Sequence, residues 1–169
     1  MSSIVTSRVR DLAIYLQDPA ATARLGLLVS AHLRAGDVVA LEGTLGAGKS
    51  VLARAVISTL CPMEDNIPSP TFTLVQTYEP EKFPVIMHFD LYRLETPEEA
   101  LELGIEDAFI DAVSLVEWPQ RLGGYLPRTA LTIDLSEGDS DTSRRAKLYG
   151  GVRWQPILEA LAEQFRRGV

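Results

Sequence analysis

An eight-residue segment, Gly-Thr-Leu-Gly-Ala-Gly-Lys-Ser at positions 43–50, constrains the fold of this 169-residue chain more than any other feature. It matches the phosphate-loop pattern G-x-x-x-x-G-K-[ST]. Glycines let the backbone curl around phosphate groups with its N–H groups directed inward, because no Cβ atom stands in the way. The apolar run 37–42 before the segment predicts a short buried strand, and the Ala-rich run 50–60 after it predicts a helix. A glycine-rich turn without a ligand is the alternative, but the order strand, loop, helix is the one that phosphate binding uses.

We therefore predict a nucleotide site in this loop. Lys49 is suited to bridge the β- and γ-phosphates, and the Ser50 hydroxyl is suited to ligate Mg²⁺. The N-terminus of the following helix adds the positive end of its dipole. The guanine-reading signature N-K-x-D is absent from the sequence, so ATP is the expected nucleotide. The predicted nucleotide-binding residues of the loop are Gly43, Thr44, Leu45, Gly46, Ala47, Gly48, Lys49, Ser50 and Val51.

Strands and helices alternate over the first 117 residues, which favours an α/β protein with a mainly parallel central sheet. We expect a three-layer fold of the P-loop NTPase type, formed by residues 1–169 as a single domain. Segment 131–135 alternates apolar and polar residues and predicts an edge or half-exposed strand. The other predicted strands are 37–42, 72–78, 85–89, 113–117 and 145–152, and the predicted helices are 20–33, 50–60, 155–165 and one that begins at Thr96 with a capping box.

Two carboxylates follow apolar strand candidates at the end where open α/β sheets gather their ligands. Asp90 follows the run Val-Ile-Met-His-Phe, and Glu117 follows Val-Ser-Leu-Val. A P-loop protein needs a carboxylate near Mg²⁺ and a group that positions the attacking water. Spacing alone does not decide which residue has which role, and a capping or solvated carboxylate is the structural alternative for either one.

Other polar and aromatic residues have two interpretations each. Thr71 can supply a hydroxyl to the metal or phosphate, as a switch loop does, or it can belong to a simple turn. His88 lies inside an apolar strand and is expected to be a core histidine rather than a catalytic base. Tyr92 and Trp118 either pack in the core or flank a binding surface, and Arg93 either meets phosphate charge or pairs with the Glu-rich segment 95–107.

Composition excludes several classes of function. The single cysteine and the two histidines argue against a disulfide framework and a His- or Cys-rich metal site. No apolar run is long enough for a membrane helix and no secretory signal is visible, so a cytoplasmic protein is expected. Residues 1–143 carry 10 basic and 21 acidic side chains, a net charge of −11, which disfavours direct binding of a nucleic-acid backbone. The basic segment 144–169 either is solvated or contacts a polyanion.

An ordered set of motifs resembles the TsaE family, also called YjeE. These bacterial P-loop ATPases are needed to make N6-threonylcarbamoyladenosine in transfer RNA. The resemblance covers about residues 20–135 and rests on five motifs in order: GTLGAGKS, then SPTFTLVQTY at 69–78, HFDLYRL at 88–94, LELGIEDAF at 101–109 and LVEWPQR at 115–121. The family commonly has an aspartate where this chain has Thr44, a position whose side chain points away from the phosphates.

The resemblance implies a set of roles. Gly46, Gly48 and Lys49 would hold the phosphates, and Ser50 with Glu117 would hold Mg²⁺. Three further residues would complete the site: Asp90 near the attacking water, Thr71 in a switch-like loop and Trp118 beside the nucleotide.

It also implies partners. The protein would be a slow Mg²⁺-dependent ATPase, stimulated by the threonylcarbamoyl-transfer proteins TsaD and TsaB, and it would meet transfer RNA only through that complex. A small-molecule kinase and an ATP-stabilised interaction module with incidental hydrolysis are the alternatives. The single arginine between Ser50 and Val85, Arg54, argues against the Arg-bearing lid of a kinase.

Overall fold

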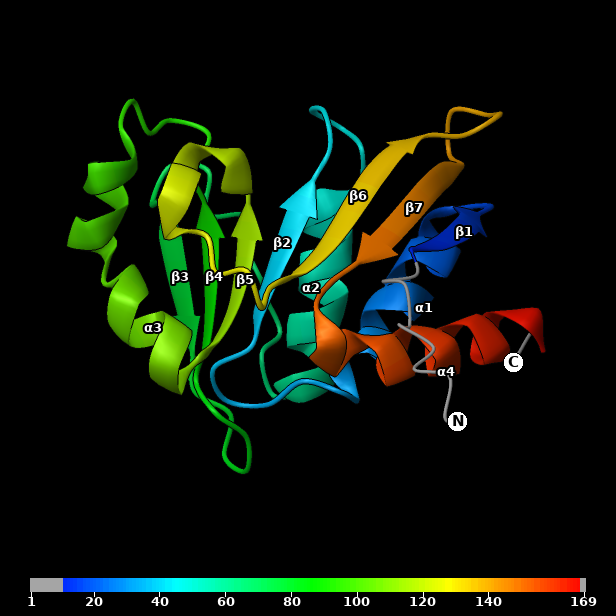
Figure 1. The fold of residues 1–169 in the computed structure, drawn as a ribbon, viewed down its shortest axis with the longest axis horizontal. Coiled ribbons are helices and arrows are strands. Elements are labelled where there is room, and N and C mark those ends of the chain that lie inside the picture. Colours follow the sequence, from blue (N-terminus) through cyan, green and yellow to red (C-terminus); the bar gives the residue numbers. More distant parts are fainter. Residues whose placement is uncertain (1–10, 168–169) are drawn as a thin grey trace, which may run out of the picture.

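The computed structural model describes residues 11–167, which form one seven-stranded mixed sheet in the order β1-β7-β6-β2-β5-β4-β3 (Figure 1). The four central strands β6, β2, β5 and β4 run parallel to one another, whereas β7, β1 and β3 are antiparallel to their neighbours. The predicted mainly parallel centre is therefore confirmed. The strands are β1 (Leu12–Leu16), β2 (Val38–Glu42), β3 (Val75–Tyr78), β4 (Ile86–Asp90), β5 (Val113–Glu117), β6 (Leu131–Glu137) and β7 (Arg144–Tyr149).

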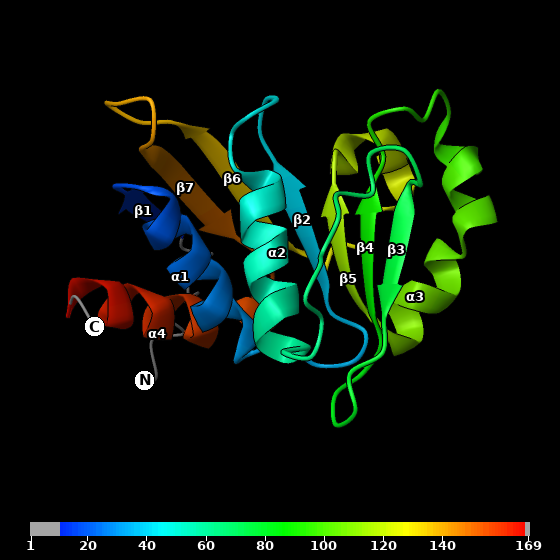
Figure 2. The same cartoon turned by 180° about the vertical axis from the view of Figure 1, so that it is seen from behind.

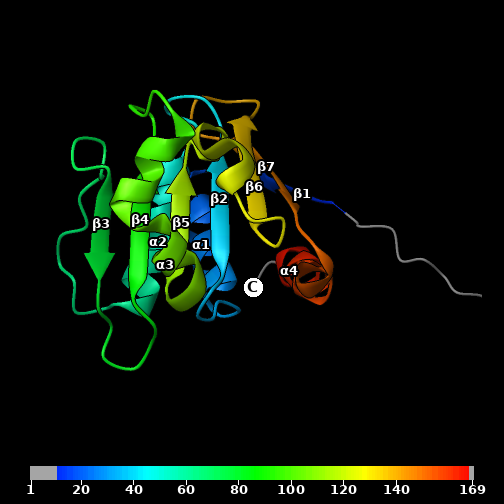
Figure 3. The same ribbon diagram turned by 60° about the vertical axis from the view of Figure 1, so that its left-hand side comes forward.

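Helices cover both faces of this sheet and give the three layers that the sequence predicts. On one face lie α1 (Pro19–Ser30) and α2 (Lys49–Leu60), in front of the sheet in Figure 2. On the other face lie η1 (Pro97–Leu103), α3 (Ile105–Asp111) and η2 (Pro119–Tyr125), coloured green to yellow in front of the sheet in Figure 3. The short η3 (Val152–Trp154) leads into α4 (Gln155–Arg166), which contacts β1 beside α1. Each face has its own buried hydrophobic cluster.

Local chemistry explains where the helices begin. The Asp18 side chain accepts a hydrogen bond from the N–H of Ala21 at 2.8 Å, and Pro19 occupies the first helical position of α1. The capping box predicted at Thr96 is present, since the Glu99 carboxylate accepts from the Thr96 N–H at 3.4 Å. That segment forms the 3₁₀ helix η1 and is followed by the separate helix α3.

The sequence-based assignment was wrong for segment 131–135. β6 is neither an edge strand nor half exposed, because it lies between β2 and β7, and Leu131, Ile133 and Leu135 are buried. Alternation of apolar and polar residues depends on what covers the two faces of a strand, and it does not show where the strand lies in the sheet. Here the antiparallel strand β7 pairs with the outer edge of β6. The true edges are β1, which the sequence did not predict, and β3, which is shorter than the predicted 72–78 because residues 71–73 form a turn.

Candidate functional site

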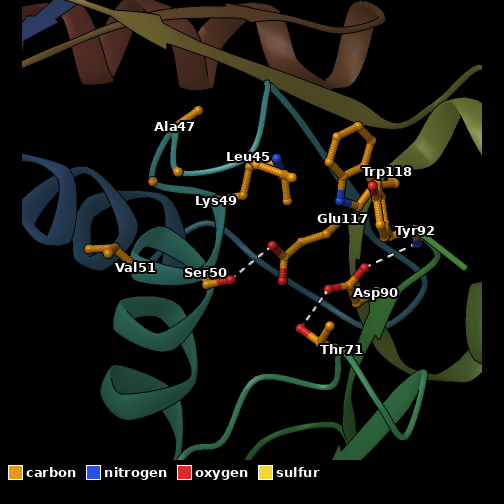
Figure 4. A pocket seen from close by; sticks show the side chains of 12 residues that line it. Leu45, Ala47, Lys49, Ser50, Val51, Thr71, Asp90, Tyr92, Glu117 and Trp118 are labelled. Carbon is orange, nitrogen blue, oxygen red and sulfur yellow. Dashed lines mark hydrogen bonds between the residues drawn. The ribbon is translucent and has the colours of Figure 1, made fainter.

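A pocket of about 230 Å³ opens at the carboxyl ends of β2, β4 and β5 (Figure 4). Three neighbouring parallel strands end there, so the residues that follow them converge although they are far apart in the sequence. The pocket is lined by Leu45, Gly46, Ala47, Gly48, Lys49, Ser50, Val51, Thr71, Asp90, Tyr92, Glu117 and Trp118. Of the predicted site residues, only Gly43 and Thr44 are not part of this lining.

The glycines of the loop have positive φ angles, which explains their positions. Gly43, Gly46 and Gly48 have φ of 142°, 79° and 106°, a region that side chains disfavour. At Gly43 an added Cβ would lie 2.5 Å from the carbonyl oxygen of Leu135, so the base of the loop fits closely against β6. Gly48 is the N-cap of α2, and the first turn of that helix therefore faces the pocket.

Lys49 is buried, with 5% of its surface exposed, and its ammonium group bonds within the loop. Nζ donates to the carbonyl oxygens of Gly43 at 2.5 Å and Thr44 at 2.9 Å, and it lies 4.2 Å from the centre of the Trp118 ring. Burial lowers the pKa of Lys49, and the negative charge of Glu117 opposes that change. A cation held this way in the pocket is suited to attract an anionic ligand.

Glu117 links α2 to the interior of the sheet. Its Oε1 accepts a hydrogen bond from Ser50 Oγ at 3.0 Å, and its Oε2 lies 2.7 Å from His88 Nε2. Glu117 and His88 are 2% and 0% exposed, and His88 Nδ1 has no hydrogen-bond partner. The imidazole therefore holds one carboxylate oxygen. The other oxygen faces Ser50 at the start of the helix (Figure 4).

Asp90 lies beside Glu117 in register, at the end of the neighbouring strand. Its Oδ2 accepts from Thr71 Oγ1 at 3.2 Å and its Oδ1 accepts from the backbone N–H of Tyr92 at 3.1 Å. Thr71 Oγ1 also lies 2.7 Å from Ser69 Oγ, which ties the Pro-rich loop to the pocket. The two carboxylates thus have different surroundings, one held by a buried histidine and one by a surface loop.

Aromatic rings form the wall opposite the loop. The rings of Tyr92 and Trp118 are 5.0 Å apart at a tilted angle of 51°. Trp118 has φ of 60°, an uncommon value for a non-glycine residue, and this conformation directs the chain from β5 into η2. Next to this wall, the guanidinium of Arg93 lies 4.5 Å from the centre of the exposed Phe72 ring instead of pairing with the Glu-rich segment.

The sequence analysis missed two contacts of the site. His88 is a core histidine as expected, but its bond to Glu117 was not foreseen. The available signal was the spacing of His88 and Asp90, two polar residues on the same face of an apolar strand. Arg144 was expected only as part of a basic segment that is solvated or contacts a polyanion, but it donates to carbonyl oxygens of the phosphate loop.

Within residues 11–167, no group of three or more His, Cys, Asp or Glu side chains is placed to hold a metal ion. Across the same residues, no helix is long and apolar enough to cross a membrane.

Strand order, glycine loop and helix start together define an α/β protein with a P-loop NTPase-like fold. The crystal structure of Bacillus subtilis YdiB has the same architecture, with a TM-score of 0.75 and 25% identity over 95% of this chain and 99% of that one.

Sequence comparison identifies the family. The family model "Threonylcarbamoyl adenosine biosynthesis protein TsaE" matches residues 16–146. This chain is 38% identical to the tRNA threonylcarbamoyladenosine biosynthesis protein TsaE of Rickettsia felis, over 76% of this chain and 74% of that one. It is 40% identical to the protein of that name from Nostoc sp., over 80% and 83% of the two chains. The chain belongs to the TsaE family.

Proposed function

We propose that this protein is the ATP-hydrolysing subunit that supports TsaD and TsaB in the N6-threonylcarbamoyladenosine modification of transfer RNA in the cytoplasm. The observation that carries the proposal is the contact of Ser50 with Glu117, 3.0 Å long, at the mouth of a glycine-rich loop in a chain of the TsaE family. The names of the relatives support the pathway, since they describe tRNA threonylcarbamoyladenosine biosynthesis.

Phosphate binding is assigned to the loop and to Lys49. The backbone N–H groups of the loop and the first turn of α2 form a positive nest for the phosphates. Lys49 exchanges its bonds to the carbonyls of Gly43 and Thr44 for bonds to phosphate oxygens, which carry a full negative charge and are stronger acceptors. Tyr92 and Trp118 flank the nucleotide on the side opposite the loop.

Ser50 and Glu117 fit Mg²⁺ because they present a hydroxyl and a carboxylate oxygen, the hard ligands that this ion prefers. Mg²⁺ is normally held by one or two protein ligands together with phosphate oxygens, and Ser50 and Glu117 would supply those protein ligands. When bound, Mg²⁺ neutralises charge on the β- and γ-phosphates. His88 keeps the Glu117 carboxylate oriented toward Ser50.

Asp90 is assigned to the attacking water. It lies at the end of β4 next to Glu117, and Thr71 and the N–H of Tyr92 fix its two oxygens. A carboxylate in this position accepts a hydrogen bond from water and orients it toward the γ-phosphate. Thr71 connects this group to the loop 62–73, so a partner that orders the loop also orders Asp90.

The partner surface is assigned to the rim of the pocket. Exposed apolar side chains gather in the segments around it: Leu45 is 72% exposed, Phe72 79% and Tyr92 42%. Large exposed apolar side chains beside a polar site are typical of protein interfaces. The net charge of −11 on residues 1–143 opposes direct binding of transfer RNA, so the RNA meets this protein only through TsaD and TsaB.

The test is ATP turnover with purified components. The protein alone should hydrolyse ATP slowly, and TsaD with TsaB from the same organism should stimulate it at least about tenfold, since groups supplied in trans raise such rates by roughly 10³ to 10⁵. Omitting Mg²⁺ should abolish turnover. Transfer RNA without the proteins should have little effect, and strong stimulation by RNA alone would favour an enzyme that acts on RNA directly.

A further inference from the structure

Arg144, the first residue of β7, reaches from the β6–β7 hairpin to the phosphate loop. Its Nε donates to the carbonyl oxygen of Ala47 at 3.1 Å and its Nη2 to that of Gly46 at 3.0 Å. Nη1 donates to the carbonyl oxygens of Asp141 at 2.8 Å and Ser143 at 2.7 Å. A half-buried guanidinium thus joins two backbone segments that are almost a hundred residues apart.

The two bonds to the loop fix consecutive peptide planes. In a trans peptide the carbonyl and the next N–H point in opposite directions, and the described residues contain no cis bond. A hydrogen bond to the Gly46 carbonyl therefore sets the direction of the Ala47 N–H. In the same way, a hydrogen bond to the Ala47 carbonyl sets the direction of the Gly48 N–H. The Ala47 N–H donates to the Thr44 carbonyl at 3.1 Å, which closes the loop on itself.

Packing restrains Ala47, which is buried in the hydrophobic core, but it does not restrain Gly46. A Cβ added at Gly46 would meet no atom within 4 Å, and Gly46 is exposed. Glycines rotate freely unless a contact restrains them. At Gly43, by contrast, the backbone of β6 fits closely against the chain. The hydrogen bond from Arg144 is therefore a main restraint on the Gly46 peptide, the exposed part of the loop.

We infer that Arg144 is a positioning residue of the phosphate loop: it holds the loop, without a ligand, in the shape that receives a diphosphate. This inference rests on the proposed nucleotide site. Lysine cannot replace arginine, because an ammonium group carries its donors on a single nitrogen, whereas Nε, Nη1 and Nη2 of Arg144 reach carbonyls in two backbone segments. Arg144 acts through the backbone, so its effect falls on any ligand that places a β-phosphate in the loop.

The chain offers a matched control in Arg145. This neighbour lies on the same strand and bonds the same hairpin, through the Glu137 carbonyl at 2.9 Å and the Asp139 carboxylate at 2.5 Å. The Arg145 side chain contacts Glu137, Asp139 and the ring of Tyr15, not the phosphate loop, and its replacement by alanine removes the same charge. Comparing the two variants therefore separates the loop contact from hairpin stability and from charge.

The experiment measures amide hydrogen exchange of the nucleotide-free protein and the affinities for ADP and ATP by calorimetry. In Arg144→Lys and Arg144→Ala, exchange should rise in residues 43–48 but not in β5. The affinities for ADP and ATP should both fall by about tenfold, which corresponds to the loss of one to two hydrogen bonds. Arg145→Ala should match the wild type in both measurements.

Two outcomes would overturn the inference. If Arg144→Lys kept the wild-type hydrogen exchange in residues 43–48 and the wild-type nucleotide affinities, a positive charge alone would account for the role of this residue. A loss of ATP affinity with unchanged ADP affinity would mean that the guanidinium contacts the γ-phosphate directly instead of shaping the loop. If the wild type bound neither nucleotide, the proposed function would fail, and the exchange rates of residues 43–48 would still decide the role of Arg144.

Discussion

Replacing Lys49 by alanine should remove the stabilisation of the protein by nucleotide while leaving it folded. At an ATP concentration about 100 times the dissociation constant, binding adds about 2.7 kcal/mol to the free energy of unfolding. For a chain of this size each kcal/mol raises the Tm by about 2 to 4 °C. We therefore expect ATP with Mg²⁺ to raise the wild-type Tm by about 5 to 11 °C, and that of Lys49→Ala by almost nothing.

The structure also bounds the effect of this substitution on the free protein. Lys49→Ala removes two charge-assisted hydrogen bonds, to the carbonyls of Gly43 and Thr44, and the contact with Trp118. It also ends the burial of a charged group, whose cost is reflected in the lowered pKa. Because these effects oppose each other and Thr44 is exposed, the free energy of unfolding should fall by only about 1 kcal/mol.

The assay is differential scanning fluorimetry with and without Mg²⁺ and ATP. Lys82→Ala is the matched control, since it removes an exposed lysine outside the pocket lining and should keep the full nucleotide-dependent shift. An equal shift in Lys49→Ala and the wild type would show that the nucleotide binds elsewhere. A variant that is unfolded before any addition would refute the estimate of about 1 kcal/mol for the free protein.

Four further substitutions test the carboxylates. Glu117→Ala should weaken Mg²⁺-dependent ATP binding more than Asp90→Ala, whereas Asp90→Ala should mainly slow single-turnover hydrolysis; the opposite pattern would exchange their roles. His88→Ala leaves a buried Glu117 oxygen without its partner and should lower the free energy of unfolding in urea by about 2 to 3 kcal/mol. Burial, with a smaller contribution from Asp134, raises the pKa of Glu42 above 4.5, so this side chain costs stability increasingly as pH rises from that value. Glu42→Gln should therefore melt higher than the wild type at pH 7 but equally at about pH 3.5; a Tm gain that is the same at both pH values would contradict the assigned cause.

The parts of the fold that the sequence predicts are those set by local patterns. β2, β4 and β5 are continuous apolar runs because both of their faces are covered, and such runs are easily recognised. The position of β6 is different, because Thr132 and Asp134 give it an alternating pattern although it lies inside the sheet. Which strand covers an edge depends on chain segments distant in sequence, and no local pattern records it.

The same distinction applies to the site. A loop motif and two carboxylates at strand ends were predictable, because parallel strands bring their carboxyl ends to one edge of the sheet. The bond between His88 and Glu117 spans 29 residues and the bond from Arg144 to Ala47 spans 97, so these contacts depend on strand order. The contacts that hold the site residues in place are therefore harder to predict from the sequence than the residues that line the pocket.

The free protein already satisfies the polar groups that the proposed ligand would use. Lys49 bonds loop carbonyls, Ser50 bonds Glu117, and Asp90 bonds Thr71. Groups buried without such partners would cost several kcal/mol each, so these bonds let the empty site remain folded. Binding of Mg²⁺ and ATP must break some of these bonds, and the measured affinity is then the difference between two sets of contacts. A partner that orders the loop through the Thr71–Asp90 contact would orient Asp90 for water without adding any group to the site. The proposed stimulation by TsaD and TsaB would then not require an arginine from either protein.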